Sequence, residues 1–263
     1  MKPNFLGIGA QKSGTTWLHY MLIQHPEIFL PKAQKELHFF DNKANYNKGL
    51  DFYESFFSDQ TTEVSVGEIT PGYMWSDDTL SKKYSINEFR FSTPERVQKI
   101  LGDDVKFIVI LRDPVIRAVS AYFHHLKRNR VSVADSILDI KGFGLLHIGF
   151  YYRNLRRWFE IFGRDSFHVA TFEELNENKE RYLRSVFEFL GVDSDFVPVA
   201  QDKKYQINAD YYLSETGAYM LKGGSEDLEA VSLSEVESLK VLYSEDANLL
   251  RDVYEVDTSL WGY

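Results

Sequence analysis

Residues 5–17 read Phe5-Leu6-Gly7-Ile8-Gly9-Ala10-Gln11-Lys12-Ser13-Gly14-Thr15-Thr16-Trp17, and this stretch predicts how the chain begins to fold. Its first five residues are a short apolar run that enters a glycine-containing turn, which is typical of a buried strand followed by a tight loop. Apolar side chains then recur at helical spacing from residue 15 to residue 24, and Pro26 closes that segment. A strand, a glycine turn and a helix in this order form the usual geometry for holding a phosphate at a helix N-terminus.

A second stretch, Lys106-Phe107-Ile108-Val109-Ile110-Leu111, is a continuous apolar run of the kind that forms a central parallel strand. It ends at Arg112-Asp113-Pro114, where the proline suits the first turn of a helix. Strand and helix patterns continue to alternate, so we expect an α/β fold with a central parallel sheet, a P-loop-like phosphate-binding turn and helices on both faces. The length suits a single domain over residues 1–263.

The later elements are predicted from periodicity and from helix-boundary residues. Residues 76–96 are polar and lack a clear period, so we expect a loop with a short helix, whereas residues 201–225 are polar and glycine-rich. The ordered segments that we expect are helices at 151–162 and 180–190, a strand at 166–172, and a last helix at 234–253 that opens with Ser234 and Glu237 in capping-box spacing.

The composition excludes several classes of function. The chain has 263 residues, 44% of them hydrophobic, no cysteine and a net charge of −9. The missing cysteines exclude disulfides and thiolate metal sites and fit a reducing compartment, and the acidic balance disfavours nucleic acid and other polyanions as partners. No apolar run approaches the ~18 residues of a membrane-spanning helix, and the N-terminus does not continue as a secretory signal. We therefore expect a soluble, cytoplasmic protein without a nucleic-acid partner, and the oligomeric state stays open.

The glycine turn has the spacing of a Walker A loop but differs in the residues that follow. A nucleotide triphosphatase places Lys and then Ser or Thr after the second glycine, and that hydroxyl binds Mg²⁺. Here Thr15 and Thr16 follow Gly14, and Lys12 precedes it by two positions. The backbone amides and the helix dipole still favour an anion, which Lys12 would approach from inside the loop. The alternative is a glycine turn that merely joins a strand to a helix.

Arg112 and Ser120 are a second pair of candidate ligands. Arg112 leaves the carboxyl end of the expected central strand, where ligands of open α/β sheets bind, and Ser120 comes two helical turns later. A guanidinium and a hydroxyl together suit a phosphate monoester. In a kinase-like interpretation Asp113 would hold Mg²⁺, and a surface ion pair with Asp113 is the simpler alternative for Arg112.

These residues resemble the family of PAPS-dependent sulfotransferases, where PAPS is 3′-phosphoadenosine 5′-phosphosulfate. Residues 11–17 look like the family's 5′-phosphosulfate loop, and residues 110–114 with Ser120 look like its 3′-phosphate element. The likeness covers roughly residues 4 to 205 in order, which is highly specific. The stretches that resemble the Golgi heparan-sulfate type in particular are 35–41, 46–53, Glu68 with 70–73, and 149–152 with Trp158 and Phe162.

The resemblance implies a reaction and a set of ligands. A sulfuryl group would pass from PAPS to a hydroxyl or amine of an acceptor such as a saccharide, a lipid or a small metabolite, which releases adenosine 3′,5′-bisphosphate and requires no metal. Trp17 would lie near the adenine, although it is equally well placed as a core residue of the first helix. The implied PAPS ligands are Gln11, Lys12, Ser13, Gly14, Thr15, Thr16 and Trp17, then Arg112 and Ser120 at the 3′-phosphate, and Lys204 in a loosely similar late segment.

Two departures separate this chain from the heparan-sulfate type. Those enzymes carry a lysine after the glutamate that matches Glu68, and this chain has Ile69 there. Their disulfide-closed late loop is also missing, because the chain has no cysteine. The PAPS site is therefore carried over, and a sulfated-polysaccharide acceptor is not.

Three residues are the candidates for catalysis: Lys12, Glu36 and His38. Lys12 would stabilise the leaving oxygen, as cations do in phosphoryl transfer. Glu36 and His38 compete as general base, and their offset of two puts them on one face if the stretch is extended. Glu36 matches the base of the heparan-type enzymes but needs burial to raise its pKa towards neutrality, whereas the pKa of a histidine is poised there.

Less specific roles stay open for the same residues. Glu36 has the alternative of a salt bridge with Lys35, and His38 that of an imidazole packed between its apolar neighbours. His124 or His125, on the helix after Arg112, is an outside candidate for the base. Two other functions compete with sulfuryl transfer: a kinase-like phosphotransferase and a non-catalytic nucleotide-binding protein.

Overall fold

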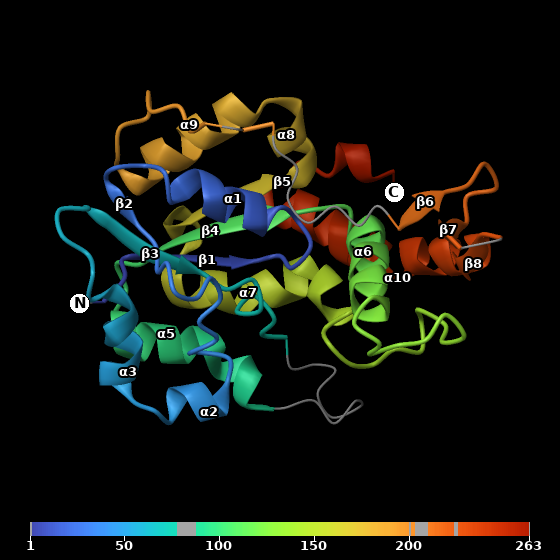
Figure 1. Ribbon diagram of the computed structural model, residues 1–263, viewed down its shortest axis with the longest axis horizontal. Coiled ribbons are helices and arrows are strands. Elements are labelled where there is room, and N and C mark those ends of the chain that lie inside the picture. Colours follow the sequence, from blue (N-terminus) through green and yellow to red (C-terminus); the bar gives the residue numbers. More distant parts are fainter. Residues whose placement is uncertain (1, 78–87, 200, 203–209, 224–225, 263) are drawn as a thin grey trace. The chain divides into compact units, whose positions relative to one another are not determined.

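A five-stranded parallel sheet forms the centre of the chain in this computed structural model, which describes residues 2–77, 88–199, 201–202, 210–223 and 226–262. The strand order is β2-β3-β1-β4-β5, and every neighbouring pair is parallel (Figure 1). The predicted central parallel sheet is confirmed. The strands are β1 (Phe5–Gly9), β2 (Ile28–Phe29), β3 (Ser65–Ile69), β4 (Lys106–Leu111) and β5 (Phe167–Thr171).

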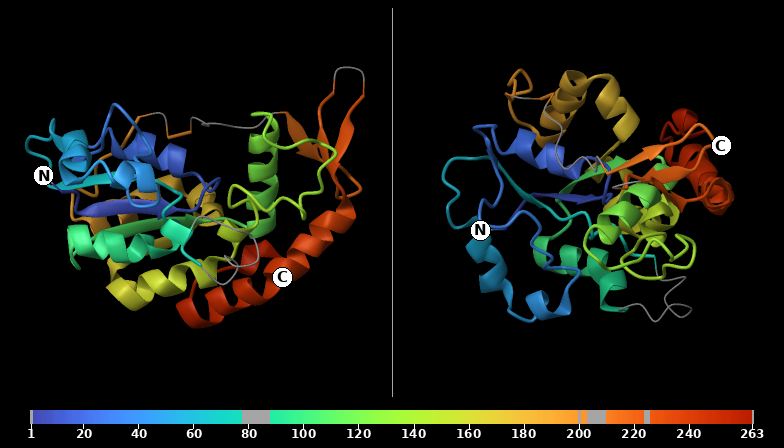
Figure 2. Two further views of the ribbon diagram at one scale, coloured as in Figure 1. Left: turned by 90° about the horizontal axis from the view of Figure 1, so that it is seen from below. Right: turned by 45° about the vertical axis from the view of Figure 1, so that its right-hand side comes forward.

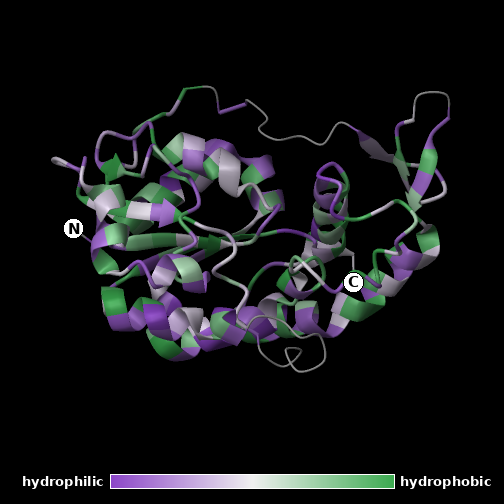
Figure 3. Cartoon of the chain, turned by 60° about the horizontal axis from the view of Figure 1, so that its bottom comes forward, coloured by the Kyte–Doolittle hydropathy of each residue, from purple (hydrophilic) through white to green (hydrophobic). Residues whose placement is uncertain are grey.

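Helices cover both faces of this sheet, as predicted (Figures 1 and 2). On one face α1 (Thr15–Leu22), α8 (Phe172–Glu177) and α9 (Lys179–Leu190) bury apolar side chains against the strands. On the other face lie α5 (Thr93–Leu101) and α7 (Tyr151–Phe162), and the ring of Phe107 lies 5.3 Å from that of Trp158. The strands are accordingly hydrophobic along most of their length (Figure 3).

The chain divides into two compact units that alternate along the sequence. The first consists of Met1–Leu111 and Arg153–Tyr205, and the second of Arg112–Tyr152 and Gln206–Tyr263. The expectation of a single domain over residues 1–263 stays a prediction. The second unit contains α6 (Pro114–Leu126), α10 (Leu233–Tyr254) and an antiparallel sheet of β6 (Tyr211–Leu213), β7 (Tyr219–Leu221) and β8 (Leu228–Val231).

Within the described ranges, no helix combines the length and the apolar character that a membrane span requires. The described residues also contain short helices and 3₁₀ turns. The short helices are α2 (Lys43–Tyr46), α3 (Leu50–Glu54), and the 3₁₀ turns Ser55–Phe57, Glu88–Ser92, His147–Gly149, Arg164–Ser166 and Ser259–Trp261.

The predicted boundaries are right where a strong apolar pattern fixes them, and they differ by one or two residues at α1, β5, α9 and α10. The strand at Lys106–Leu111 and the helix at Tyr151–Phe162 have the predicted bounds. The capping box of α10 is formed by Ser232 and Glu235, not by Ser234 and Glu237. Both pairs have the same spacing, but the amide of Glu235 bonds to the Ser232 hydroxyl, and the Ser232 amide bonds to the Glu235 carboxylate. The helix therefore begins directly after β8.

Candidate active site

The loop between β1 and α1 has the backbone shape that an anion cradle requires. Gly14 is the N-cap of α1 and has a φ of 93°, a left-handed conformation that glycine adopts without strain. A Cβ at this position would also lie 3.0 Å from the ring of Phe172. Lys12 has a φ of 71°, which is sparsely populated for any residue with a side chain. Such outliers cluster at functional sites, where the surrounding structure maintains them.

Two buried polar atoms of this loop have no hydrogen-bond partner among the described residues. Ser13 is fully buried, and its hydroxyl has no hydrogen-bond partner within the described part of the chain. The side-chain oxygen Oε1 of Gln11 is also buried without a hydrogen-bond partner among the described residues. An unsatisfied buried hydroxyl costs about 1–3 kcal/mol, and the oxygen of a bound phosphate or sulfate group would accept its proton. The residues present therefore fit an anionic group at the start of α1.

Trp17, the last residue of the predicted loop motif, is packed into the core. Its indole is 7% exposed and belongs to the hydrophobic cluster between α1, α9 and the sheet. The indole N–H donates a hydrogen bond of 2.8 Å to the carbonyl of Gln201, and the ring lies 6.2 Å from that of Tyr182. These contacts support the core alternative for Trp17, and its contact with adenine stays a prediction.

Lys35 connects the anion loop to the candidate base. Its ammonium donates to the hydroxyl of Thr16 over 2.9 Å and to the carboxylate of Glu36 over 3.2 Å. Thr16 stands in the first turn of α1, so the predicted phosphate-binding residues and the predicted catalytic stretch lie next to each other in the first unit. The salt bridge between Lys35 and Glu36, an alternative from the sequence, is present.

Glu36 and His38 meet in a chain of charged groups. The His38 ring lies between two carboxylates: its Nε2 is 3.4 Å from Glu36 and its Nδ1 is 3.1 Å from Asp41. Asp41, whose side chain is fully buried, also accepts a hydrogen bond of 3.1 Å from Arg90. The same Arg90 nitrogen donates to the carbonyl of Gly72. The two candidates for the base thus form an ion pair with each other, and each side chain is 40% exposed at the surface of the first unit.

A missing side chain at Gly72 makes room for this cluster. A Cβ on Gly72 would lie 2.8 Å from the Asp41 carboxylate and 3.4 Å from the His38 ring. Because Asp41 is held by both His38 and Arg90, it has little freedom to move away. Glycine at this position therefore follows from the close approach of the backbone to the carboxylate.

The protonation states differ from the expectation. Burial acts to lower the pKa of His38, but hydrogen bonds and charges from Asp41 and Glu36 outweigh it and raise the pKa to about 10. Burial acts to raise the pKa of Glu36, but the hydrogen bond from His38 and the charge and hydrogen bond of Lys35 outweigh it and lower the pKa to about 2. Burial therefore does not raise the pKa of Glu36 towards neutrality, and the near-neutral pKa expected for His38 is wrong. At neutral pH His38 is an imidazolium and Glu36 is a carboxylate.

The second pair of candidate ligands belongs to the second unit. Ser120 is buried on α6, and the backbone carbonyl of Arg112 accepts a hydrogen bond of 2.7 Å from the Tyr151 hydroxyl. Asp113 caps α6, because its Oδ1 accepts the amides of Val115 and Ile116. One oxygen of the carboxylate proposed for Mg²⁺ is therefore already engaged in capping.

Three further predicted residues receive no assignment from the geometry. His125 is buried and its ring stacks 4.4 Å from that of Phe143, while His124 bonds to Arg128. Both histidines belong to the second unit. Lys204 lies outside the described residues.

Three members of the site were not singled out as functional residues by the sequence. Lys35 and Asp41 stand inside a stretch that the family resemblance marked, and their spacing from Glu36 and His38 is a usable signal. Arg90 comes from the polar segment that was expected to be a loop, and nothing in its surroundings in the sequence indicates a partner in Asp41.

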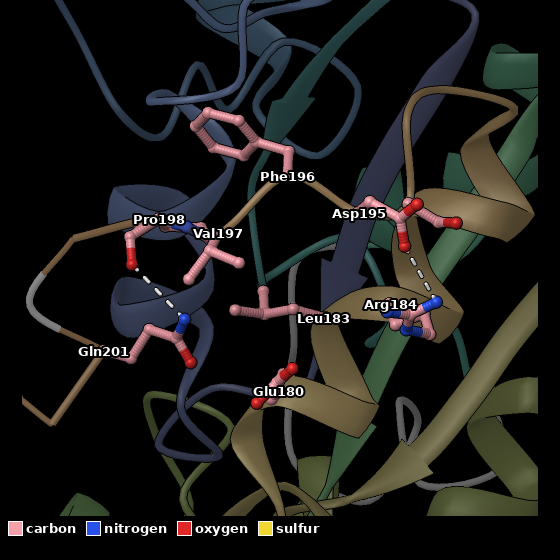
Figure 4. Close-up of a pocket in the computed structure, with 9 residues that line it drawn as sticks. Glu180, Leu183, Arg184, Asp195, Phe196, Val197, Pro198 and Gln201 are labelled. Carbon is pink, nitrogen blue, oxygen red and sulfur yellow. Dashed lines mark hydrogen bonds and ion pairs between the residues drawn. The ribbon is translucent and has the colours of Figure 1, made fainter.

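A separate pocket lies on the α9 side of the first unit (Figure 4). None of the predicted site residues lines it, although one lining residue, Gln201, bonds to Trp17. Among the described residues, no cluster of three or more His, Cys, Asp or Glu side chains is arranged to hold a metal ion. The pocket is lined by Glu180, Leu183, Arg184, Ser194, Asp195, Phe196, Val197, Pro198 and Gln201.

The shifted pKa of His38 predicts a pH dependence of folding stability. Because the pKa is raised from 6.5 to about 10 in the folded chain, His38 contributes fully below pH 6.5, and this contribution is lost as the pH rises through 10. The difference in unfolding free energy between the wild type and His38→Gln should therefore shrink between these values, as measured by urea denaturation.

His168→Gln is the control for this measurement. Burial lowers the pKa of His168 to about 4, so its contribution is already complete above pH 6.5 and is lost only as the pH falls through 4. The wild type and His168→Gln should differ by a constant amount from pH 6.5 to pH 10. A constant difference for His38→Gln as well would contradict the imidazolium assignment.

Comparison with known proteins places this chain in a family. A sulfotransferase domain family matches residues 2–215. Human heparan sulfate glucosamine 3-O-sulfotransferase 5 is 27% identical over 202 residues, which are 72% of this chain and 54% of the relative. Mouse bifunctional heparan sulfate N-deacetylase/N-sulfotransferase 4 is 31% identical over 208 residues, or 72% of this chain and 22% of the relative. The chain thus spans about half the length, or less, of these curated relatives.

A solved structure agrees over the whole length. The crystal structure of a sulfotransferase from Alicyclobacillus acidocaldarius covers 100% of both chains, with 25% identity and a TM-score of 0.74. The sulfotransferase domain from the curacin biosynthetic pathway, at 12% identity and a TM-score of 0.56, shares the fold. Together with the loop and the charged cluster, these matches show that the chain is an enzyme that belongs to the sulfotransferase domain family.

Proposed function

We propose that this chain transfers a sulfuryl group from PAPS to a hydroxyl or amine of an acceptor and releases adenosine 3′,5′-bisphosphate. Membership of the sulfotransferase family supports sulfuryl transfer in general. The observation that carries the finer proposal is the contact of Lys35 with both Thr16 and Glu36, because it joins an anion loop to a carboxylate. A donor group held by the loop and a base that faces the acceptor are the two parts that the reaction requires.

The loop residues would bind the phosphosulfate end of PAPS, which supplies an activated sulfuryl group. The Ser13 hydroxyl lacks a partner within the described residues and would donate to a phosphate or sulfate oxygen. Lys12 and the amides at the start of α1 would stabilise the negative charge that grows on the leaving oxygen. Gln11, Gly14, Thr15 and Thr16 complete the proposed cradle, and Trp17 is proposed to lie near the adenine.

Arg112 and Ser120 are proposed to hold the 3′-phosphate. The proposal rests on the family resemblance of these positions and on the chemistry of a guanidinium and a hydroxyl, which suit a phosphate dianion. Lys204 is proposed as a further ligand on the same resemblance. The two residues belong to the second unit, and Lys204 lies outside the described residues.

Glu36 is proposed as the general base, and His38 as the group that orients it. The His38 ring is charged at neutral pH, so it has no free lone pair with which to take a proton. Glu36 is ionised and aligned by His38 and Lys35. A carboxylate with a low pKa is a weak base at rest, but an attacking hydroxyl becomes strongly acidic as its oxygen bonds to sulfur. A weak base that is already in position is therefore sufficient at that stage.

The acceptor is proposed to be a saccharide, a lipid or a small metabolite. The named relatives are heparan sulfate sulfotransferases, but they match this chain over only part of their length. The net charge of −9 and Ile69, where those enzymes carry a lysine, argue against a long polyanion. The cytoplasmic location and the absence of a nucleic-acid partner stay predictions.

Two alternatives to sulfuryl transfer are less favoured. A kinase-like phosphotransferase would use Asp113 for Mg²⁺, and one oxygen of that carboxylate caps α6. A non-catalytic nucleotide-binding protein would have no use for the aligned Glu36, His38 and Asp41.

Ligand-induced stabilisation separates these alternatives. Adenosine 3′,5′-bisphosphate should raise the melting temperature, because a ligand at 100 times its Kd stabilises the folded state by about 2.7 kcal/mol. ATP with Mg²⁺ should raise it much less, and thermal denaturation with each ligand makes the comparison. A larger shift with ATP and Mg²⁺ would favour the kinase-like alternative and contradict the proposed donor.

Substitutions in the two proposed phosphate sites should have different effects. Lys12→Ala removes a charge that acts on the leaving oxygen, so kcat should fall about 10²- to 10³-fold. Arg112→Ala removes a charged hydrogen bond to the 3′-phosphate, so the Kd for adenosine 3′,5′-bisphosphate should rise roughly 10- to 100-fold. Transfer of labelled sulfate from PAPS and calorimetric titration measure the two effects.

Lys32→Ala is the matched control for the loss of a lysine. Lys32 is exposed and lies outside the proposed site, so this variant should retain the turnover and affinity of the wild type. Activity like that of the wild type in Lys12→Ala, with an intact fold by circular dichroism, would overturn the assignment of the loop.

The base is tested by comparing Glu36→Gln with His38→Gln. Glu36→Gln removes the proton acceptor and should lower kcat by about 10²- to 10⁴-fold. His38→Gln keeps a hydrogen-bond donor beside Glu36, so its loss should be smaller. Initial rates are measured with labelled PAPS and a panel of a neutral oligosaccharide, a long-chain alcohol and an aromatic amine. A larger loss in His38→Gln than in Glu36→Gln would make the histidine the base.

A further inference from the structure

A buried carboxylate, Glu68, lies beneath the proposed catalytic stretch. It stands on β3, its side chain is fully buried, and three hydroxyls donate to it. Tyr53 and Tyr73 donate to Oε1 over 2.8 and 2.9 Å, and Thr70 donates to Oε2 over 2.6 Å. Burial raises the pKa of Glu68 to about 7 in spite of these hydrogen bonds. Burying a carboxylate costs free energy, which its hydrogen bonds must offset.

Two of the three hydroxyls also accept hydrogen bonds from backbone amides on either side of His38. The oxygen of Thr70 accepts the amide of Leu37 over 3.0 Å, and the oxygen of Tyr73 accepts the amide of Phe39 over 2.9 Å. A hydroxyl has one proton to donate. Because that proton is directed to Glu68, the lone pairs of each oxygen remain for the amides. The carboxylate thus fixes the direction of both hydrogen bonds.

The two anchored amides, of Leu37 and Phe39, lie on either side of His38, which has an unfavourable backbone conformation. His38 has a φ of 48°, an unfavourable conformation for a residue with a side chain, which persists only where its neighbours enforce it. Leu37 and Phe39 point into the core and are 1% exposed, whereas Glu36 and His38 point outward. By fixing the backbone at Leu37 and Phe39, the two hydrogen bonds keep the side chains of Glu36 and His38 on the outward side.

We propose that Thr70 and Tyr73, oriented by the buried Glu68, are positioning residues that hold Glu36 and His38 in the geometry needed for sulfuryl transfer. This inference rests on the proposed function for its catalytic consequence. The arrangement itself is independent of the identity of the donor or acceptor, because every contact in it lies within the first unit. The side chains of Glu68, Thr70 and Tyr73 are fully buried, so their effect would act through residues 36–39, which they anchor.

The chain offers a matched pair of variants. Tyr53 and Tyr73 donate to the same oxygen of Glu68, but only the Tyr73 hydroxyl also accepts the Phe39 amide. Among the described residues, Tyr53 contacts residues 37–40 through its ring, which lies 4.4 Å from that of Phe39 and 5.1 Å from that of Phe40 and is retained in phenylalanine. Asn45 still holds the carbonyls of Leu37 and His38 in both variants. Tyr53→Phe and Tyr73→Phe therefore lose the same hydroxyl and differ in the backbone anchor.

The test combines an assay of transfer with a measurement that needs no acceptor. Tyr73→Phe and Thr70→Val should lower kcat about 10- to 100-fold at an unchanged KM for PAPS, whereas Tyr53→Phe should stay within about twofold of the wild type. Thr70→Ser restores the hydroxyl and should restore kcat. In NMR titrations of the imidazole carbons, Tyr73→Phe should lower the pKa of His38 from its value of about 10, and Tyr53→Phe should leave it unchanged.

Each outcome distinguishes this inference from the proposed function. Equal effects of Tyr53→Phe and Tyr73→Phe on kcat and on the His38 titration would overturn the positioning role, because the loss would then follow from Glu68 alone. A wild type that transfers no sulfate, while the His38 titration differs between the two variants, would contradict the proposed function and support the arrangement. Unchanged stabilisation by adenosine 3′,5′-bisphosphate in Tyr73→Phe would confirm that the loop site is intact.

Discussion

The contact of Lys35 with Thr16 and Glu36 is the interaction on which the rest of the site depends. Its ammonium links the first turn of α1 to the stretch that carries the carboxylate. Without this cation, the Glu36 carboxylate and an anion bound in the loop would face each other with little between them. The energy of that repulsion grows as the site loses water. In the proposed function, Lys35 would therefore allow the base and the anionic donor to occupy neighbouring positions.

The same cluster supports the proposal that this acidic protein binds an anionic cofactor. The chain carries a net charge of −9, yet among the described residues Lys35, His38 and Arg90 form ion pairs with two carboxylates, those of Glu36 and Asp41. With His38 protonated, the cluster has an excess of positive charge beside the loop. A local field of this kind is set by nearby groups, since more distant surface charges are screened within about 8–10 Å. The overall charge thus bears on the acceptor more than on the donor.

The fold was predictable from the sequence where one property fixes an element. A continuous apolar run fixed the bounds of β4, and the glycines around Lys12 fixed the anion loop. The strands β6 to β8 were missed, because each has only three or four residues and several of their side chains are exposed. The start of α10 was misplaced because two pairs share the capping-box spacing, and only the hydrogen bonds distinguish them.

The structure brings the candidates Glu36 and His38 together, but the sequence could not indicate their protonation states. Glu36 and His38 share one side of their stretch, as their offset of two suggested. Their pKa shifts depend on Asp41 and Lys35, and the position of Asp41 depends on Arg90, which is 49 residues further along the chain. A short sequence pattern contains no information about such a partner. The direction of a pKa shift is thus a property of the folded neighbourhood.

Different groups are proposed to bind the donor and to align the base. In the proposed function the loop would offer the donor its amides, the Lys12 ammonium and the Ser13 hydroxyl, whereas the backbone around Glu36 and His38 is held by groups buried beneath it. Because the anchors at Thr70 and Tyr73 contact the main chain, side chains around the acceptor can differ between relatives while the base keeps its place.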